Sequence, residues 1–534
     1  MVKKIKKRKG KSARLGGGGQ LPLLAEASFG PELAGVSREL GSEDFINPRP
    51  EALFCGTQRL RDYLESRGMT EVLRLRELIF ESDLSGFLSD YSPLGRRPLH
   101  PGVMLGLIYF GIMEGKRSLR DLEDLARFDV RAWWLCGGAQ PDHSTIGNFL
   151  NRFRELLTEE YFLTQARALA GKLQLGVGGA SADGTVLEAA ASRFRAIKRE
   201  AAEQALAEAT RAREARPQDE GLRAAAGKAQ VVAETLRARC AQAAARSRKA
   251  SPRICPSEPE AVIQKQKGHN FRPSYKGSVL TNGQRLILGQ DVHPSDEGSS
   301  LGPMLLQYEQ VLGGLPTRLL LDAGYHNYAT LSLSVERELN VLCPAGSGAG
   351  NQWEKNSNKA GFGKAHFRYE AGADVYRGPC GQVLRRCGTG KSRGLACLIY
   401  ECRKWRECGF HGQCTKSKGA RRIQRFAGDE LKEAMAKVFE QPRARAEYRR
   451  RKAEVEPVFS EFRGGQNFNR FRRFGLAGAK LEFSLHCQAY NLKRALRLMV
   501  GAVFCFIFGR GPGGIRGMGL LMVVYVKRRG SDEN

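Results

Sequence analysis

The sequence predicts an α/β protein in which helices flank a mixed sheet and an all-helical domain precedes that sheet. Three observations predict this fold class. Apolar residues recur at helical spacing from residue 50 to about residue 170. From residue 275 onward, short strand-like runs alternate with helical stretches. Two segments of different composition, 196–250 and 345–428, interrupt the second pattern, and we interpret them as insertions.

Composition limits what such a protein can bind. The chain has 534 residues, which is enough for two to four domains, and its 86 Lys and Arg against 56 Asp and Glu give a net charge of +30. Nucleic acid is the leading partner because dispersed cations neutralise phosphates and release counterions. An anionic membrane surface is the rival, although no stretch reaches the roughly 18 to 20 apolar residues of a spanning helix. The basic N-terminus lacks the apolar segment of a signal peptide, so we expect a cytoplasmic, nucleoid-associated protein.

The N-terminal third is expected to contain a disordered arm and a helical domain. Residues 1–50 are basic and then glycine-rich, and residues 51–172 carry the helical pattern. Late in this domain, two helices around a short connector could form a helix-turn-helix, with Asp142 or Ser144 capping the second helix. Asn148 and Arg152 on that second helix would then contact DNA. A helical bundle that only packs on the rest of the protein is the alternative.

The sheet is expected to come from residues 173–195 and 251–344. Its first strand carries Asp183, and a hairpin follows around an Asn282-Gly283 turn. A helix, a strand that ends at Asp322, a second helix and a last strand complete the pattern. Strand, hairpin, helix, strand, helix, strand is the order of an RNase-H-like sheet.

The two insertions differ in kind. Residues 196–250 are rich in Ala, Arg, Glu and Lys and predict a helical hairpin that breaks near Pro217. Residues 345–428 contain six cysteines whose spacing differs from that of a standard zinc ribbon. Three of them could form a structural zinc site, with buried or free thiols as the alternative: Cys402, Cys408 and Cys414.

Three carboxylates stand at the edges of apolar segments. Asp183 and Asp322 lie on predicted strands, and Glu456 lies on a helix predicted over 441–462 that Pro457 should bend. Two-metal cleavage of a phosphodiester needs such carboxylates, because Mg²⁺ prefers oxygen ligands. Each acid alone could be a surface or capping residue, but together they predict a metal-dependent site beside a polyanion. Nearby groups would contact phosphates: Tyr448, Arg451, Lys452 and Arg463.

The strings around these acids resemble those of the DDE transposases of bacterial insertion sequences. They are Asp183-Gly184-Thr185, Asp322-Ala323-Gly324-Tyr325 and Val455-Glu456-Pro457-Val458-Phe459, and the likeness runs from about residue 98 to residue 494. The resemblance implies that Asp183, Asp322 and Glu456 hold Mg²⁺ or Mn²⁺ for cutting and joining DNA. It also implies a homodimer that binds the terminal repeats of a mobile element and target DNA.

The chain departs from the family pattern in two places. The tyrosine, arginine, glutamate and lysine signature of the family maps onto Lys452, Glu456 and Arg463, whereas Tyr448 and Arg451 are each one residue out of register. Residues 429–500 complete the catalytic domain, and residues 501–534 form an atypical tail. These departures favour a second hypothesis, a catalytically inactive or domesticated DNA-binding protein. A nuclease that never joins strands is a third.

Overall fold

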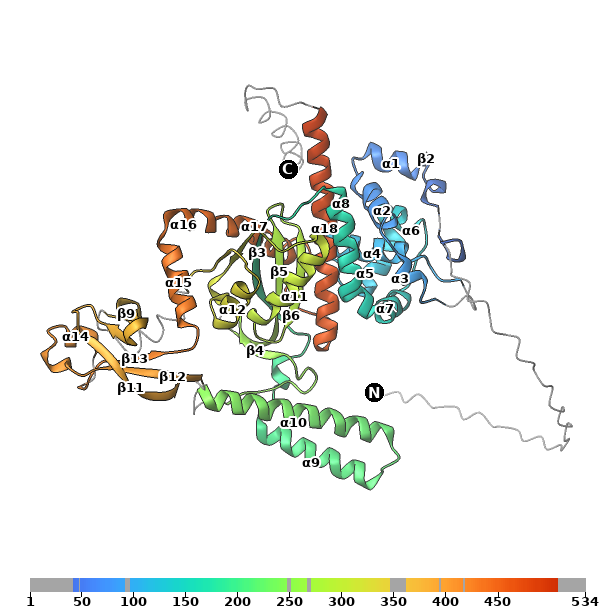
Figure 1. The fold of residues 1–534 in the computed structure, drawn as a ribbon. Helices are drawn as coiled ribbons and strands as arrows, with labels where there is room; N and C mark the ends of the chain where they lie inside the picture. Colours follow the sequence, from blue (N-terminus) through green and yellow to red (C-terminus); the bar gives the residue numbers. More distant parts are fainter. Residues whose placement is uncertain are drawn as a thin grey trace, which may run out of the picture.

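The computed structural model shows a helical N-terminal region, a mixed sheet flanked by helices, and a smaller sheet at the far end of a connecting helix (Figure 1). The residues that it describes are 42–47, 49–91, 97–246, 251–266, 270–345, 362–392, 395–415 and 418–507. The expectations for residues 1–41, and for the tail beyond residue 507, lie outside these ranges. Within them, no helix is long and apolar enough to cross a lipid bilayer.

The N-terminal helices pack around α4, Pro101–Met113, which contains no charged residue and is buried along nearly its whole length. A helix without a polar face has to lie inside the protein. The other N-terminal elements are β1 (Phe54–Cys55), β2 (Gln58–Arg59), α1 (Leu60–Ser66), α2 (Glu71–Phe80), α3 (Ser85–Leu88), α5 (Leu119–Phe128), α6 (Val130–Cys136), α7 (His143–Arg152) and α8 (Tyr161–Lys172).

The predicted helix-turn-helix needs a correction. The connector between α5 and α7 is itself a helix, α6, because Asp129 caps its start and Trp134 is buried against the core. The predicted cap of α7 is confirmed, since Asp142 Oδ1 accepts a hydrogen bond of 2.7 Å from the Thr145 amide. Three successive helices therefore stand where we expected two.

The arm ends earlier than residue 50. Phe45 is buried, with its ring edge-on to Tyr91 and His100. The Ile46 amide donates to the Pro98 carbonyl at 2.8 Å, and the His100 amide donates to the Ile46 carbonyl at 3.0 Å. These contacts order residues 42–47, because one aromatic side chain and two backbone hydrogen bonds tie them to the start of α4.

The main sheet has six strands in the predicted element order, with β4 as an addition. The strands are β3 (Gly179–Glu188), β4 (Val262–Lys265), β5 (Phe271–Asn282), β6 (Ile287–His293), β7 (Arg318–Leu321) and β8 (Val341–Leu342). The hairpin strand β5 pairs antiparallel with β3 on one edge and with β4 and β6 on the other. β7 runs parallel to β3, and β8 runs parallel to β7. The three parallel strands β3, β7 and β8 therefore point to the same end of the sheet, where β7 stops at Leu321 and β3 continues to Glu188, so that Asp183 lies within β3.

Helices cover this sheet. The helices α11 (Leu301–Leu312) and α12 (Tyr328–Glu336) lie between successive strands along the chain, as predicted. The long helix α18 (Gly475–Ile507) lies between the sheet and the N-terminal helices (Figure 1) and contacts both β6 and α4. Its residues Leu481, Leu485 and Leu492 belong to the same buried cluster as α4. The helical region therefore shares its core with the C-terminal helix.

The first insertion is the predicted helical hairpin. It consists of α9 (Arg199–Ala215) and α10 (Glu220–Arg246), which lie side by side away from the main sheet (Figure 1). The break between them falls at residues 216–219, around Pro217. Alanine and long charged side chains favour helix, and proline ends it.

The second insertion folds as a five-stranded antiparallel sheet. Its strands are β9 (Arg368–Glu370), β10 (Val375–Arg377), β11 (Val383–Ser392), β12 (Leu395–Cys402) and β13 (Arg422–Arg425), with the two short helices η9 (Trp405–Glu407) and α14 (His411–Cys414) between the last two strands. The helix α15 (Asp429–Glu440) leads back to the main sheet, where α16 (Pro442–Tyr448) and α17 (Arg450–Arg463) follow (Figure 1).

His100 makes the helical region sensitive to acid. Its Nδ1 accepts a hydrogen bond of 3.1 Å from the Gly102 amide at the start of α4, and its ring stacks on Phe80. Burial, with a smaller effect of the nearby Arg76 charge, lowers the pKa of His100 to about 4. The unfolded chain therefore binds this proton more readily, and the stability that His100 contributes is lost as the pH falls from about 6.5 towards 4.

We expect this group to remove about 2 kcal/mol of unfolding free energy between pH 7 and pH 5. Urea unfolding at both pH values, followed by tryptophan fluorescence, measures the effect. In His100→Asn the side-chain amide oxygen can still cap α4 but does not titrate. This variant should therefore lose about 2 kcal/mol less unfolding free energy than wild type between pH 7 and pH 5. An unchanged pH dependence in the variant would show that His100 is not the responsible group.

Candidate active site

Two of the three predicted acids meet at one edge of the main sheet. In the parallel pair formed by β3 and β7, Ala182 stands opposite Leu321. Asp183 and Asp322 are the next residues of the two strands, and adjacent parallel strands lie about 5 Å apart. Asp322 leaves the sheet here, and its Oδ1 accepts a hydrogen bond of 2.7 Å from the Gly324 amide. The strand order thus brings together two carboxylates from distant parts of the sequence.

Asp183 is paired with a cation from α17. Arg451 Nη2 lies 2.8 Å from Asp183 Oδ2, and both side chains are largely buried, with 14% and 17% exposed. Burial raises the pKa of Asp183 to about 6; the Arg451 charge opposes this rise, and the Asp322 charge adds to it. Arg451, which the sequence suggested as a phosphate contact, therefore neutralises one of the acids.

A third carboxylate, Glu297, lies beside both acid-bearing strings, and sequence reasoning missed it. A side chain added at Gly184 would come within 2.7 Å of Glu297 Cγ, and one added at Gly324 would come within 2.9 Å of Glu297 Oε2. Glu297 therefore occupies the space between the two acid-bearing strings, where Lys276 Nζ contacts its Oε1 at 2.8 Å. The glycines of these strings were the available signal, since each leaves room for the Glu297 side chain.

Glu456 does not join the aspartates. Its side chain is 54% exposed and lies 3.9 Å from Lys452 Nζ. It follows Arg451 by five residues, or about 7.5 Å along the helix axis. Among the described residues, no group of three or more His, Cys, Asp and Glu side chains is spaced to hold a metal ion. The structure therefore unites Asp183 with Asp322 and leaves the predicted three-acid set incomplete.

The expectation for the helix around Glu456 is wrong in detail. The helix predicted over 441–462 is interrupted at Arg449, where α16 ends and α17 begins, and α17 continues through Pro457 to Arg463. Val455, Val458 and Phe459 are buried around the proline. Pro457 has no amide hydrogen to donate within the helix, which weakens the helix locally. Packing of the three apolar side chains offsets this loss, so α17 continues through the proline.

The predicted phosphate contacts have different environments. Tyr448 is half-buried, with its ring edge-on to Phe439. Arg463 Nη2 donates a hydrogen bond to the Thr185 hydroxyl, in the first acid-bearing string. Lys452 is 78% exposed. Of the four predicted groups, Lys452 is thus the one whose side chain faces water most fully.

The two predicted DNA contacts of α7 also differ. Asn148 is exposed. Arg152 Nε contacts Asp90 Oδ2 at 2.5 Å, and its guanidinium lies 4.3 Å from the centre of the Tyr91 ring. Arg152 therefore links α7 to the segment that contains Asp90 and Tyr91. DNA binding by these two residues stays a prediction.

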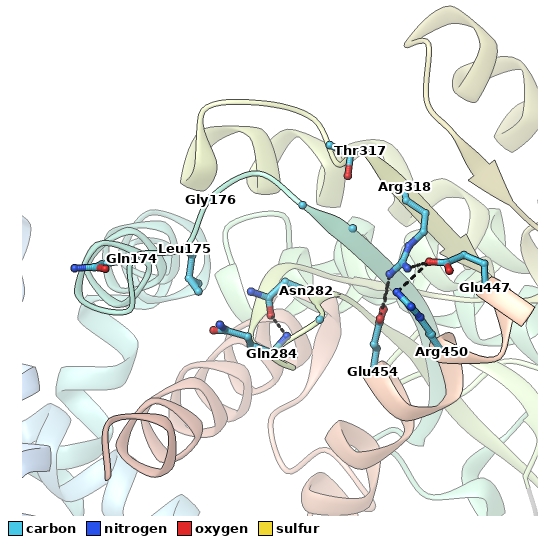
Figure 2. A pocket seen from close by; sticks show the side chains of 13 residues that line it. Gln174, Leu175, Gly176, Asn282, Gln284, Thr317, Arg318, Glu447, Arg450 and Glu454 are labelled. Atoms are coloured by element: carbon cyan, nitrogen blue, oxygen red, sulfur yellow. Dashed lines mark hydrogen bonds and ion pairs between the residues drawn. The ribbon is translucent and has the colours of Figure 1, made fainter. Parts of the chain in front are cut away.

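A buried ionic network fixes α17 on the sheet. Arg318 Nη2 lies 3.0 Å from Glu454 Oε1, and Arg318 Nη1 also contacts Glu447 on α16 (Figure 2). Glu454 Oε2 accepts a hydrogen bond of 2.5 Å from the Ser181 hydroxyl of β3. Arg318 and Glu454 keep only 16% and 11% of their side chains exposed. These contacts position the helix that carries Arg451 and Glu456.

The pocket drawn in Figure 2 lies beside this network, away from the acids. It is lined by Gly179 and Arg318, the first residues of β3 and β7, together with Glu447, Arg450 and Glu454. The acids follow four residues later on the same strands, about 13 Å away. The pocket is therefore separate from the edge of the sheet where the aspartates meet.

Comparison with known families gives two matches. A family model described as a transposase DDE domain matches residues 379–496, and one described as a transposase domain (DUF772) matches residues 62–152. The first range contains Glu456 and all of α17, whereas Asp183 and Asp322 lie outside both ranges. No curated protein matches the chain. The chain is thus similar to transposases over two separate segments, in its N-terminal helices and in its C-terminal part.

Proposed function

We propose that this chain, which carries a transposase DDE domain and a DUF772 transposase domain, cleaves and joins DNA strands at the ends of an insertion sequence. The observation that carries the proposal is that Asp183, within β3, and Asp322, just after β7, both follow the last paired residues of these two parallel strands, beside the helix that carries Arg451 and Glu456. The sheet order β6, β5, β3, β7, β8 supports an RNase-H-like catalytic domain, since three antiparallel strands precede two parallel ones.

The donor atoms at this edge suit a divalent metal. Asp183, Asp322 and the nearby Glu297 offer carboxylate oxygens, which Mg²⁺ and Mn²⁺ prefer. We propose that Asp183 and Asp322 hold the metal ions, with Glu456 as the third ligand. When bound, the ions would activate the attacking oxygen and stabilise the leaving oxygen.

The protein has its own part in preparing this site. Arg451 now neutralises Asp183, so it has to withdraw from the carboxylate before that group can bind a metal. Glu456 has to approach the aspartates, and both changes involve the same helix, α17. We propose that DNA binding causes both changes, because a phosphate gives Arg451 an alternative anionic partner. Lys452 is exposed beside Glu456 and can contact the same DNA backbone.

Glu297 and Lys276 position the acid-bearing strings. The Glu297 side chain fills the space above Gly184 and Gly324, and its ion pair with Lys276 fixes it there. A carboxylate that is paired in this way holds neighbouring segments in place without needing a metal.

The chain has a net charge of +30. We propose that it binds the terminal repeats and the target DNA as a homodimer, because its excess of cations neutralises phosphates.

Metal removal is the experiment that tests the function. With DNA carrying the terminal repeats of its element, the wild-type protein should cut strands in Mg²⁺ or Mn²⁺ and should stop when EDTA is added. Gel-shift binding should persist, because the cationic surface does not depend on the metal. Sequencing of products made with a target plasmid then distinguishes joined strands from simple hydrolysis. Equal cleavage with and without EDTA contradicts the proposal.

A second function is favoured by one observation. Asp183 is neutralised by Arg451 and Glu456 is apart from both aspartates, as expected of a DNA-binding protein that no longer cleaves. If the protein binds element-end DNA in a gel shift but does not cleave it at any Mg²⁺ or Mn²⁺ concentration, its function is DNA binding without cleavage.

A further inference from the structure

Four cysteines converge at one end of the five-stranded sheet. They line a single small cavity together with Trp405, His411 and Arg421: Cys380, Cys402, Cys408 and Cys414. Cys380 lies between β10 and β11, Cys402 ends β12, Cys408 follows η9, and Cys414 ends α14. The fold therefore brings them together from two connections, β10–β11 and β12–β13, and from the end of β12. The zinc site suggested by the sequence contained Cys402, Cys408 and Cys414 but not Cys380.

The sulfur atoms of Cys380 and Cys408 are already close. They lie 3.1 Å apart. Two thiolates on one zinc ion are roughly 3.8 Å apart, as follows from tetrahedral bonds of about 2.3 Å. A disulfide would require about 2.05 Å. The S–S distance of this pair thus lies between those of a disulfide and of two zinc ligands, and among the described residues no three His, Cys, Asp or Glu side chains are spaced to hold a metal ion, so zinc binding would require the other thiols to move closer.

The other two thiols lie in the same cavity as this pair. Cys402 and Cys414 are buried, and both line the cavity with Cys380 and Cys408. A divalent cation bound there would take the four sulfurs as thiolates and release their protons.

The five-stranded sheet has a small apolar core. Its cluster of buried apolar side chains has seven members: Phe367, Tyr376, Leu384, Tyr400, Cys402, Cys414 and Ile423. Two of the seven are cysteines of the cavity. Small modules with so limited a core commonly use a metal or disulfides, and none of the described cysteines forms a disulfide.

We propose that Cys380, Cys402, Cys408 and Cys414 together bind one structural Zn²⁺. Four thiolates are a complete tetrahedral set for zinc, with no open position for catalysis. Arg421 lines the same cavity and offsets part of the excess negative charge of four thiolates around a divalent ion. His411 has another role, since its ring packs on Trp405 and its Nε2 lies 3.0 Å from the Gly419 carbonyl. The site goes beyond the proposed DNA chemistry and does not depend on it.

Two cysteines of the same sheet provide matched controls. Cys387 is exposed on β11, with its sulfur directed to the Ile399 carbonyl at 3.4 Å. Cys397 is buried on β12, opposite Gly390. Neither lines the cavity. Their replacement by serine tests for general loss of a thiol in this sheet without touching the proposed ligands.

Elemental analysis of the full-length protein, purified with reducing agent and zinc in the medium, tests the proposal. We expect about one zinc per chain, retained in Cys387→Ser and Cys397→Ser and reduced at least several-fold in Cys380→Ser and Cys408→Ser. If the variants do not fold, a mercurial reagent added to wild type should release the zinc as four thiols react. A wild-type protein without zinc, a Cys380→Ser variant that keeps it, or alkylation showing a disulfide between Cys380 and Cys408 would overturn the proposal. None of these results bears on Mg²⁺-dependent cleavage.

Discussion

The Asp183→Asn variant is expected to cleave DNA in Mg²⁺ about a thousandfold more slowly than wild type, because a metal ligand stabilises the transition state by several kcal/mol. Asp183 lies within β3, next to the point where the parallel strand β7 gives way to Asp322, and asparagine keeps its size while removing its charge. Binding of DNA should be retained, since Arg451 is released from its ion pair and can contact phosphate. The measurements are the initial cleavage rate on element-end DNA and the gel-shift affinity.

Asp291 on β6, which is separated from β3 by β5, provides the control for Asp183. It is largely buried and forms an ion pair with Lys480 at 2.9 Å, so its replacement also removes a buried carboxylate from this sheet. Asp291→Asn can lower stability, but it should cleave at a rate close to wild type once folded. Cleavage by Asp183→Asn at the wild-type rate would refute the assignment of the metal site.

Arg318→Met is expected to destabilise the protein by roughly 3 to 5 kcal/mol, because it leaves a buried carboxylate without its cation. Arg318 contacts both Glu454 and Glu447, and Glu454 in turn binds Ser181 of β3. Loss of this network should loosen α17, which carries Arg451 and Glu456. Cleavage should fall with it. Urea unfolding and limited proteolysis around α17 would measure the two effects.

Arg450 is a matched control in the same pocket. It also pairs with Glu447, at 3.4 Å, but it is 66% exposed (Figure 2). Exposed ion pairs contribute at most about 1 kcal/mol, so Arg450→Met should change little. Adding Glu454→Leu to Arg318→Met should restore part of the stability, since it removes the unpaired charge. Equal stability of the Arg318 and Arg450 variants would show that the network does not hold α17.

The strands and acids of the main sheet could be predicted because their signals are local. Asn282-Gly283 marks a hairpin turn, and the apolar run before Asp322 marks the end of a strand, whereas β3 continues past Asp183 to Glu188. The structure has β5 and β6 around that turn and both aspartates at one edge. The helical hairpin of the first insertion was predictable for the same reason, since its composition strongly favours helix.

Other elements depended on distant contacts. The helix α6 was hidden in a predicted connector because its aromatic residues show no clear periodicity by themselves, and only burial of Trp134 in the core explains it. The helix α17 passes through Pro457 because its apolar side chains pack on the sheet. In both places tertiary packing outweighs the local preference of the residues.

The sequence by itself determined the kind of protein: a mixed sheet that carries two aspartates on neighbouring strands, two insertions, and a cationic chain similar to transposases. Only the tertiary structure decided the electrostatics. It paired Arg451 with Asp183, placed Glu297 between the two acid-bearing strings, kept Glu456 apart, and added Cys380 to the other three cysteines. The physical reason is that strand ends and turns follow from neighbouring residues, whereas ion pairs and shared cavities join side chains that are far apart in the chain and meet only when it folds.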